Sequence, residues 1–365
     1  MAVDAVVVLN ARTRFPSTGD DALSMLRRSR PAGGAECNTH ASRALPWARR
    51  LHTSLSMHRS DADGPDVPAP HWRAALRLLG WLPQGALSRG FGRMADVPIP
   101  PSMRRTVLGA FAAAVGADVS EAEQPLDAYP TLNRFFTRKL KPGARAWPTD
   151  PAVVASPVDG AVGQLGTVRE GRLIQAKGRV YDAAKLLDEV DAGRRFEGGA
   201  FITLYLSPKD YHRIHAPVAG EIRAARHVPG SLLPVNAPSV AHMPELFARN
   251  ERLMCHLDGP AGRVAVVAVG AYNVGRISAA FDAGWNAAPG ESAWVTNRRG
   301  LQSAARAYDP PVRVQQGDEI MTFHLGSTVV LLFEPGRVEL DPTLRPDSVV
   351  RLGMPIGRAL MPAAA

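Results

Sequence analysis

The sequence predicts an α+β fold in which a helical N-terminal part precedes a mainly antiparallel β domain. Before Trp147, apolar residues recur at the three- and four-residue spacing of amphipathic helices. After it, short apolar runs are bounded by Gly, Pro and other turn residues, a pattern typical of strands joined by tight turns. With 365 residues, of which 45% are hydrophobic and 21% charged, the chain is long and apolar enough for one large core or two modest ones.

Composition divides the chain into three regions. Residues 1–66 mix Arg, Ser, Asp, Gly and Pro without sustained periodicity, so we expect a disordered extension there. Residues 67–147 form the helical region, and residues 148–365 form the β-rich domain. The apolar run at residues 5–9 is too short for a signal-peptide core and has no basic flank before it, which argues against export.

Two apolar stripes define the expected helices of the second region. Arg73 and Arg77 lie off the first stripe, and the second stripe follows Arg104 and Arg105. The stripes consist of Trp72, Ala75, Leu76 and Leu79, and of Val107, Leu108, Phe111, Ala112 and Val115.

The helical region is basic, since residues 71–147 carry eleven Lys or Arg against five Asp or Glu. Such helices suit a bilayer interface, where Trp72 and Trp81 would lie at headgroup depth while arginines meet anionic lipid. No apolar stretch reaches the roughly 18 residues that a spanning helix needs. We therefore expect a membrane-facing region that lies on the bilayer without crossing it. The alternative is a pair of core-packing helices with solvated arginines.

Elements of the β-rich domain follow from the same patterns. Alternating apolar runs predict strands at residues 200–206, 263–269 and 328–333. Helical exceptions are expected at residues 182–188 and 243–249.

The formal net charge of +9 predicts an anionic partner, which could be a nucleic acid, an acidic membrane surface or a phosphorylated substrate. The absence of an aromatic-rich basic β motif weakens the RNA alternative. Cys37 and Cys255 are the only cysteines, so no disulfide framework is expected.

One short segment has the residues that a self-cleaving site requires. Gly326 places a small, unhindered carbonyl directly before Ser327, at the entrance of the strand predicted at residues 328–333. Attack of the Ser327 hydroxyl on this carbonyl would turn the peptide bond into an ester, because glycine allows the close approach that the attack demands. β-Elimination would leave a dehydroalanine, which hydrolyses to a pyruvoyl group with loss of ammonia. On this segment alone, an ordinary strand is the better interpretation.

Two further segments supply a base and a group to orient it. Asp159 lies at a turn between Pro157 and Gly160, and His212 and His215 are three residues apart. A serine hydroxyl becomes an effective nucleophile when an imidazole takes its proton and a carboxylate fixes the imidazole tautomer. A zinc site built on the two histidines is the weaker interpretation, because no third and fourth ligand has a fitting spacing.

Six ordered motifs follow one another along the chain: Phe135-Phe136-x-Arg138-x-Leu140-Lys141-Pro142-Gly143, Ser156-Pro157-Val158-Asp159-Gly160, Ile174-Gln175-Ala176-Lys177-Gly178, Tyr211-His212-Arg213-x-His215-x-Pro217, Leu246-Phe247-x-Arg249-Asn250-Glu251-Arg252 and Leu325-Gly326-Ser327-Thr328. With these motifs in this order, the sequence resembles the pyruvoyl-dependent phosphatidylserine decarboxylases of the bacterial and mitochondrial type, and the resemblance covers roughly residues 70–345. One departure is that Tyr272 and Arg276 stand where members of the family more often have Thr and Ser.

The resemblance implies a role for each candidate residue. Asp159, His215 and Ser327 would form the self-processing triad, and the bond between Gly326 and Ser327 would be cleaved. The implied cofactor is the pyruvoyl group that replaces Ser327, which forms a Schiff base with phosphatidylserine and releases carbon dioxide and phosphatidylethanolamine. His212 would be the acid–base group of decarboxylation, since an ordinary imidazole pKa near 6.5 allows both protonation states near neutrality.

The resemblance also implies partners and a location. The expected enzyme is a carboxy-lyase whose cleaved α and β chains remain together as a heterodimer. It would bind peripherally to the anionic, cytoplasmic face of the cell membrane, with no metal and no nucleic-acid partner.

Two other function classes stay open at this point. One is a non-catalytic basic β module that binds membranes, in which the N-terminal arginines carry the function. The other is a serine hydrolase that uses Asp159, His215 and Ser327 on external esters, although no Gly-x-Ser-x-Gly elbow surrounds Ser327. Only the decarboxylase predicts a break in the chain.

Overall fold

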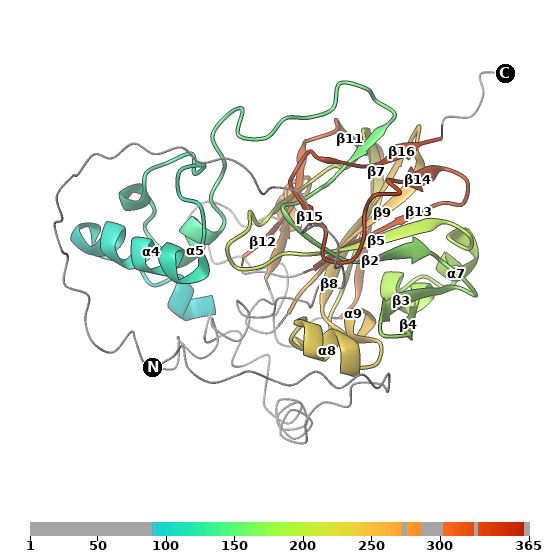
Figure 1. Cartoon of the computed structure of the whole chain (residues 1–365), viewed down its shortest axis with the longest axis horizontal. Helices are drawn as coiled ribbons and strands as arrows, with labels where there is room; N and C mark the ends of the chain where they lie inside the picture. Colours follow the sequence, from blue (N-terminus) through green and yellow to red (C-terminus); the bar gives the residue numbers. More distant parts are fainter. Residues whose placement is uncertain (1–89, 91, 272–275, 286–301, 325–327, 361–365) are drawn as a thin grey trace, which may run out of the picture. The chain divides into compact units, whose positions relative to one another are not determined.

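A computed structural model of the chain describes residues 90, 92–271, 276–285, 302–324 and 328–360 (Figure 1). The extension expected at residues 1–66 and the stripe that begins at Trp72 lie outside these residues. The described helices are α4 (Pro101–Val115), η2 (Leu126–Ala128), α5 (Leu132–Phe136), α6 (Ala183–Leu187), α7 (Ala192–Arg195), α8 (Ala237–His242), α9 (Leu246–Arg249) and η3 (Ala283–Trp285).

Strands dominate the chain after Trp147, as the sequence predicts. They are β1 (Val153–Ala155), β2 (Gly160–Thr167), β3 (Arg172–Ala176), β4 (Arg179–Asp182), β5 (Ala200–Tyr205), β6 (Arg213–His215), β7 (Gly220–Val228), β8 (Arg252–Gly259), β9 (Gly262–Val269), β10 (Ile277–Ala279), β11 (Ala304–Val314), β12 (Glu319–Phe323), β13 (Thr328–Phe333), β14 (Val338–Leu340), β15 (Val349–Val350) and β16 (Pro355–Ala359).

The strands form one large sheet and three small ones. The large sheet has the order β11-β7-β8-β9-β13-β5-β2-β15, and the small sheets are β1-β16-β14, β10-β12-β6 and β3-β4. Every pairing between these strands is antiparallel. The mainly antiparallel β architecture is therefore confirmed.

Strand β13 lies inside the large sheet and is buried on both faces. It pairs with β5 on one side and β9 on the other, although the three strands are far apart in sequence (Figure 1). Val329 and Leu331 pack into one hydrophobic cluster, while Val330 and Leu332 pack into the cluster on the opposite face. Because successive side chains of a strand point to opposite faces, a continuous apolar run is what such a central strand requires.

The predicted elements of the β-rich domain are found with one change of length. The strands expected at residues 200–206, 263–269 and 328–333 are β5, β9 and β13, and the helix expected at residues 182–188 is α6. Asp182 starts α6 by accepting hydrogen bonds from two backbone N–H groups of its first turn. The helix expected at residues 243–249 is reduced to α9, because Glu245 adopts a left-handed conformation with φ of 52°.

Helix α4 contains the second apolar stripe, and most of that stripe is core. Leu108 and Ala112 are buried against Tyr129 and Phe135. Leu108 and Ala112 therefore fit the alternative of a core-packing helix, because they are buried and are not available to a bilayer. Within the described residues, no helix combines the length and apolar character needed to span a membrane.

Candidate active site

Asp159 lies in the turn that joins β1 to β2. A Cβ atom at the next residue, Gly160, would lie 2.3 Å from the carbonyl oxygen of Tyr205, so the turn needs glycine there. The Ser156 hydroxyl donates to the carbonyl of Val158 at 2.7 Å and closes the turn from the other side. These local contacts hold Asp159 at a fixed, largely buried position.

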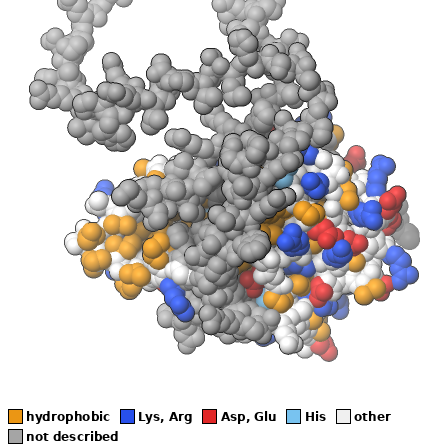
Figure 2. Space-filling view, turned by 90° about the horizontal axis from the view of Figure 1, so that it is seen from below, with side chains coloured by type: hydrophobic (Ala, Val, Ile, Leu, Met, Phe, Trp, Pro, Cys, Tyr) orange, Lys and Arg blue, Asp and Glu red, His pale blue; other side chains and the backbone are white. Residues whose placement is uncertain are grey.

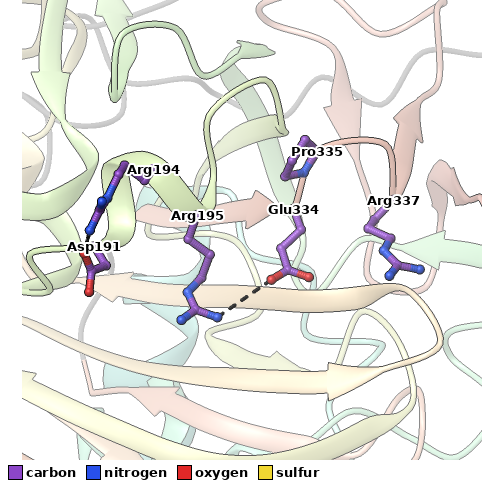
Figure 3. Close-up of a pocket in the computed structure, with 6 residues that line it drawn as sticks. All are labelled: Asp191, Arg194, Arg195, Glu334, Pro335 and Arg337. Atoms are coloured by element: carbon purple, nitrogen blue, oxygen red, sulfur yellow. Dashed lines mark hydrogen bonds and ion pairs between the residues drawn. The ribbon is translucent and has the colours of Figure 1, made fainter.

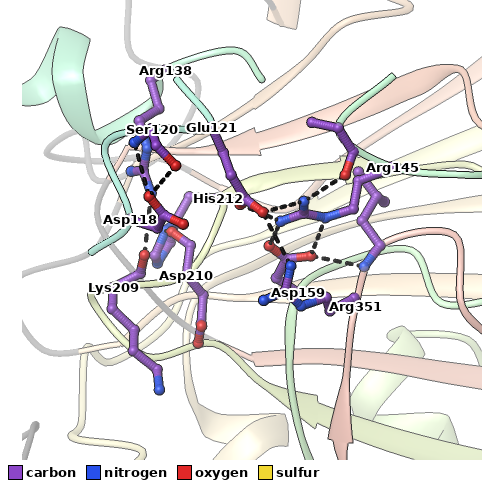
Figure 4. Close-up of polar contacts among 12 residues, drawn as sticks. Asp118, Ser120, Glu121, Arg138, Arg145, Asp159, Lys209, Asp210, His212 and Arg351 are labelled. Atoms are coloured by element: carbon purple, nitrogen blue, oxygen red, sulfur yellow. Dashed lines mark hydrogen bonds and ion pairs between the residues drawn. The ribbon is translucent and has the colours of Figure 1, made fainter. Parts of the chain in front are cut away.

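A guanidinium group holds the Asp159 carboxylate (Figure 4). Arg145 donates from Nε to Oδ1 at 3.0 Å and from Nη2 to Oδ2 at 2.5 Å. The backbone N–H of Leu352 donates to Oδ1 at 2.8 Å. Arg145 also binds Glu121 at 2.8 and 2.9 Å, and Arg351 donates to the same Glu121 carboxylate at 3.0 Å. Both Asp159 oxygens therefore accept charge-assisted hydrogen bonds in a bidentate arrangement.

His215 ends β6 and presents one ring nitrogen as a base. A carbonyl oxygen can only accept, so Nδ1–H donates to the carbonyl of Gly317 at 2.6 Å. Nε2 then carries the lone pair and accepts from the Tyr211 hydroxyl at 3.1 Å. Gly317 has φ of 94°, and a Cβ there would lie 2.9 Å from the Trp147 ring. Burial lowers the pKa of His215, which favours the neutral imidazole that a general base requires.

The structure brings Asp159 and His215 to adjoining segments without a direct bond. The backbone N–H of His215 donates to the carbonyl of Pro157 at 2.9 Å, so the turn that carries Asp159 lies directly beside β6. Among the described residues, no hydrogen bond joins the two side chains. The carbonyl of Gly317 takes the place that the Asp159 carboxylate was expected to occupy. It fixes the same tautomer but provides no full negative charge to stabilise the imidazolium.

His212 directly precedes β6, and its imidazole is fully buried. Its Nδ1–H donates to the carbonyl of Asp210 at 2.7 Å, and its ring lies 4.0 Å from that of Phe136. Loss of hydration and the nearby positive charge of Arg138 lower the pKa of His212 to about 3. The ordinary imidazole pKa assumed from the sequence is therefore wrong for this structure, and His212 is neutral near pH 7.

Gly326 and Ser327 lie outside the described residues, but both flanks of their segment are described. On one side, the backbone N–H of Phe323 donates to the carbonyl of His212 at 2.9 Å. On the other side, Thr328 begins β13 and pairs with Tyr205 and Val269. The residues of the predicted cleavage site are therefore tethered between β12 and β13, with His212 beside the β12 end.

Two buried polar atoms near these flanks have no hydrogen-bond partner among the described residues. They are His212 Nε2 and Thr328 Oγ1. Buried polar atoms are almost always satisfied, so such atoms indicate a partner supplied by another group. The residues around segment 325–327 thus fit a small polar group such as the pyruvoyl that Ser327 would form.

Arg145 and Tyr211 contact the predicted site residues and were missed as functional residues. Arg145 binds Asp159, and the Tyr211 hydroxyl contacts His215 Nε2. Tyr211 could have been found, because it belongs to the same motif as His212 and His215. Arg145 follows the Pro142-Gly143 turn, and nothing in the sequence around it indicates a functional role.

Arg276, one of the two residues that depart from the family pattern, contacts the residue just before the predicted cleavage segment. Its Nη1 donates to the carboxylate of Asp96 at 2.7 Å, and Asn133 donates to the same carboxylate at 2.9 Å. The carbonyl of Arg276 accepts from the backbone N–H of His324, which directly precedes the predicted cleavage segment. Arg276 therefore connects the helical region to the strand end next to the cleavage segment.

A cavity of about 490 Å³ elsewhere on the surface is lined by the pairs Arg194–Asp191 and Arg195–Glu334, together with Pro335 and Arg337 (Figure 3). Its charged groups largely pair with one another, and its described lining includes none of the predicted site residues. The chemistry therefore belongs to the segment around β6.

The buried histidines predict a loss of stability in mild acid. Burial lowers the pKa values of both His212 and His324 to about 3, whereas the unfolded chain binds protons below about pH 6.5. Above pH 6.5 the histidines contribute no pH dependence, and as the pH falls from 6.5 toward 3 the unfolded state gains protons that the folded state does not. We expect the free energy of unfolding of the uncleaved Ser327→Ala protein to fall by about 2 kcal/mol per histidine between pH 7.5 and 5.

Urea unfolding across this pH range measures the effect, and His212→Asn in the same background is the matched variant. It should lose the share of one histidine, about 2 kcal/mol of the fall. An identical pH profile in the two proteins would contradict the assignment of a neutral, buried His212.

The fold and site define a mainly antiparallel β enzyme with one buried and one half-buried histidine as its candidate acid–base groups. The chain belongs to the phosphatidylserine decarboxylase family, whose sequence model matches residues 132–358. A phosphatidylserine decarboxylase proenzyme of Anaeromyxobacter sp. (strain K) is 48% identical over 286 residues, which cover 78% of this chain and 97% of that protein. Proteins of the same name from Myxococcus xanthus (strain DK1622) and Azotobacter vinelandii (strain DJ / ATCC BAA-1303) are 44% and 42% identical, covering 77% and 78% of this chain and 97% and 98% of their own lengths.

Proposed function

We propose that this chain is a phosphatidylserine decarboxylase proenzyme that cleaves itself between Gly326 and Ser327. Family membership supports the activity. The structural observation that carries the proposal concerns the described flanks of this junction. The backbone of Phe323, at the end of β12, bonds that of His212, and β13 begins at Thr328, while His212 Nε2 has no hydrogen-bond partner among the described residues.

Self-cleavage begins with the neutral imidazole of His215. Its Nε2 accepts the Ser327 hydroxyl proton, and the serine oxygen forms an ester bond with the Gly326 carbonyl carbon as the Ser327 nitrogen leaves. Elimination then releases Gly326 as a C-terminal carboxylate. Water hydrolyses the resulting enamine, so ammonia departs and a pyruvoyl group remains at the new N-terminus. In this scheme Tyr211 must give up its contact with Nε2 before Ser327 can reach it.

Decarboxylation then depends on how the chain binds and protonates its substrate. When present, the pyruvoyl carbonyl supplies an electron sink for the bond that breaks. His212 Nε2 is the atom that would hold the proton delivered to the substrate carbon in place of carbon dioxide. A substrate carboxylate beside the ring would raise the pKa of this buried histidine, because an opposite charge favours the imidazolium.

Strand pairing supports a stable two-chain product. The C-terminal fragment would begin at residue 327 and keep β13 between β5 and β9, with β16 paired to β1. Strand β13 makes eleven residue pairings with its two neighbouring strands, and its side chains are buried on both faces. We therefore expect the cleaved α and β chains to remain a heterodimer.

The membrane surface is proposed from apolar side chains around α4 that do not pack inward. Met94, Val97 and Met103 are between 50% and 59% exposed, and Val107 is 39% exposed. Figure 2 shows hydrophobic side chains gathered on one part of the surface. With exposed arginines nearby, this patch suits peripheral attachment to the anionic cytoplasmic face of the cell membrane.

Acidic substitutions on this patch should weaken membrane binding. We expect Met103→Glu combined with Val107→Glu to reduce flotation with phosphatidylserine vesicles by about tenfold, because two apolar contacts are lost and two negative charges meet anionic lipid. Ser102→Glu combined with Ala113→Glu adds the same charge on another side of α4 and serves as the control. Equal flotation of the two double variants would remove this patch from the membrane surface.

The activity is tested with purified full-length protein and phosphatidylserine labelled in its carboxylate. Release of labelled carbon dioxide, together with an intact-mass spectrum that shows two fragments, supports the proposal. A protein that stays whole and hydrolyses simple esters would instead indicate a serine hydrolase.

A further inference from the structure

A second cavity, of about 330 Å³, lies where the helical region meets β6. One part of its wall comes from the residues around η2 and α5, including Tyr129 and Arg134, and another comes from Arg213 of β6. The Arg213 guanidinium donates twice to the carbonyl of Thr137, at 2.8 and 3.0 Å, and thereby joins the two parts of the wall.

The cavity is strongly basic. Four of its lining side chains are cationic, namely Arg134, Arg138, Lys139 and Arg213, and Glu123 is the single acidic one. The charge of Arg213 is balanced by Glu319, because Nη1 of Arg213 donates to both carboxylate oxygens at 2.7 Å. No hydrogen bond or ion pair among the described residues occupies the head groups of Arg134 and Lys139, so an anion would find two cationic groups available.

Arg138 is the second, independent sign of a ligand. Its side chain is 4% exposed, and its Nε has no hydrogen-bond partner among the described residues. Its guanidinium donates from Nη2 to the carbonyl of Lys209 at 3.1 Å and lies over the Phe135 ring, 5.1 Å from the ring centroid, but no hydrogen bond or ion pair joins it to a carboxylate among the described residues. A buried guanidinium without a carboxylate partner is costly, and an oxyanion in the cavity would offset that cost.

The cavity adjoins the reaction site through two short connections. Arg213 follows His212 directly in the chain, and Thr137 follows Phe136, whose ring lies 4.0 Å from that of His212. Figure 4 shows Arg138 close to His212. Tyr129 in the cavity wall also packs in the cluster beneath α4, next to the exposed apolar patch. A lipid held by the patch would thus have its polar headgroup near this cavity.

We propose that this cavity binds the phosphate group of a glycerophospholipid headgroup, with Arg134, Arg138 and Lys139 as its ligands. The inference rests on the proposed function and extends it, because it names the residues that would hold the substrate's phosphate while His212 faces its serine carbon. Arginine and lysine are the usual phosphate ligands, and the cavity is at the small end of the range for ligand sites.

The test uses full-length Ser327→Ala protein, which keeps binding separate from cleavage. Calorimetry with glycerophosphoserine compares this protein with a version carrying Arg134→Gln and Lys139→Gln. We expect about tenfold weaker binding in the double variant, since two hydrogen bonds to a charged group are lost. A version carrying Arg169→Gln and Arg172→Gln removes the same charge from exposed sites outside the cavity and outside the apolar patch, and should bind within about twofold of the parent.

The same two double variants are then made in the cleavable protein. The cavity variant should raise the KM for phosphatidylserine in mixed micelles by about tenfold while kcat and the rate of self-cleavage stay nearly constant. Equal effects of the cavity and control variants, or no effect of either, would overturn the proposal. If inorganic phosphate binds as tightly as glycerophosphoserine, the site serves free phosphate and the headgroup assignment is wrong.

These outcomes are independent of the proposed function itself. Failure of the wild-type chain to cleave or to release carbon dioxide would overturn the decarboxylase assignment, whereas the calorimetric comparison would still report whether the cavity takes a phosphate.

Discussion

Ser327→Ala is expected to leave the chain whole and without decarboxylase activity. Alanine has no hydroxyl to attack the Gly326 carbonyl, so neither the ester nor the pyruvoyl group can form. Wild-type protein should instead consist of residues 1–326 and residues 327–365. The second fragment should be lighter, by one ammonia, than the same fragment with a seryl end. Intact-mass spectrometry distinguishes these products directly.

Chemical behaviour of the small fragment provides a second measurement. A pyruvoyl end has no amine, so the fragment should resist Edman sequencing, and borohydride or hydroxylamine should abolish decarboxylation by consuming the carbonyl. Ser303→Ala, a serine replacement away from the junction, is the control and should cleave normally. Decarboxylation by a single uncleaved wild-type chain, or a fragment with a free seryl N-terminus, would show that the site assignment is wrong.

The second large effect is expected from the two histidines, which should separate the two reactions. Loss of a general base typically lowers a rate by roughly 10²- to 10⁴-fold, so His215→Ala should remain a single chain on the timescale in which wild type is fully cleaved. His212→Ala should still cleave but decarboxylate phosphatidylserine slowly, by a similar factor. Gel mobility and carbon dioxide release report the two steps independently, and His242→Ala is the histidine control.

The strand register makes this comparison informative. His212 accepts from Phe323 at the end of β12, whereas His215 pairs with Glu319 at the start of that strand. His212 is therefore the histidine whose backbone lies next to the described end of the cleavage segment. If His212→Ala abolished cleavage as completely as His215→Ala, the division of labour between the histidines would have to be abandoned.

Much of the β domain could be predicted because its strands are recognisable from local composition. The run at residues 328–333 is apolar throughout, and it forms a strand that is buried on both faces. The helix expected at residues 243–249 was too long, because periodicity does not report the left-handed backbone of Glu245. The stripe with Leu108 and Ala112 was identified as apolar, but the surface that covers it comes from Tyr129 and Phe135, which periodicity within α4 cannot reveal.

The sequence by itself determined the antiparallel β character, the family and the candidate residues, because these depend on residue types at short spacings and on the order of motifs. The tertiary structure alone decided which groups surround those residues. Asp159 is held by Arg145 and by the backbone of Leu352, nearly two hundred residues away, while Gly317 fixes the tautomer of His215. The pKa of a histidine and the binding of an anion depend on burial and on charges brought together across the fold, and neither is encoded in the local pattern.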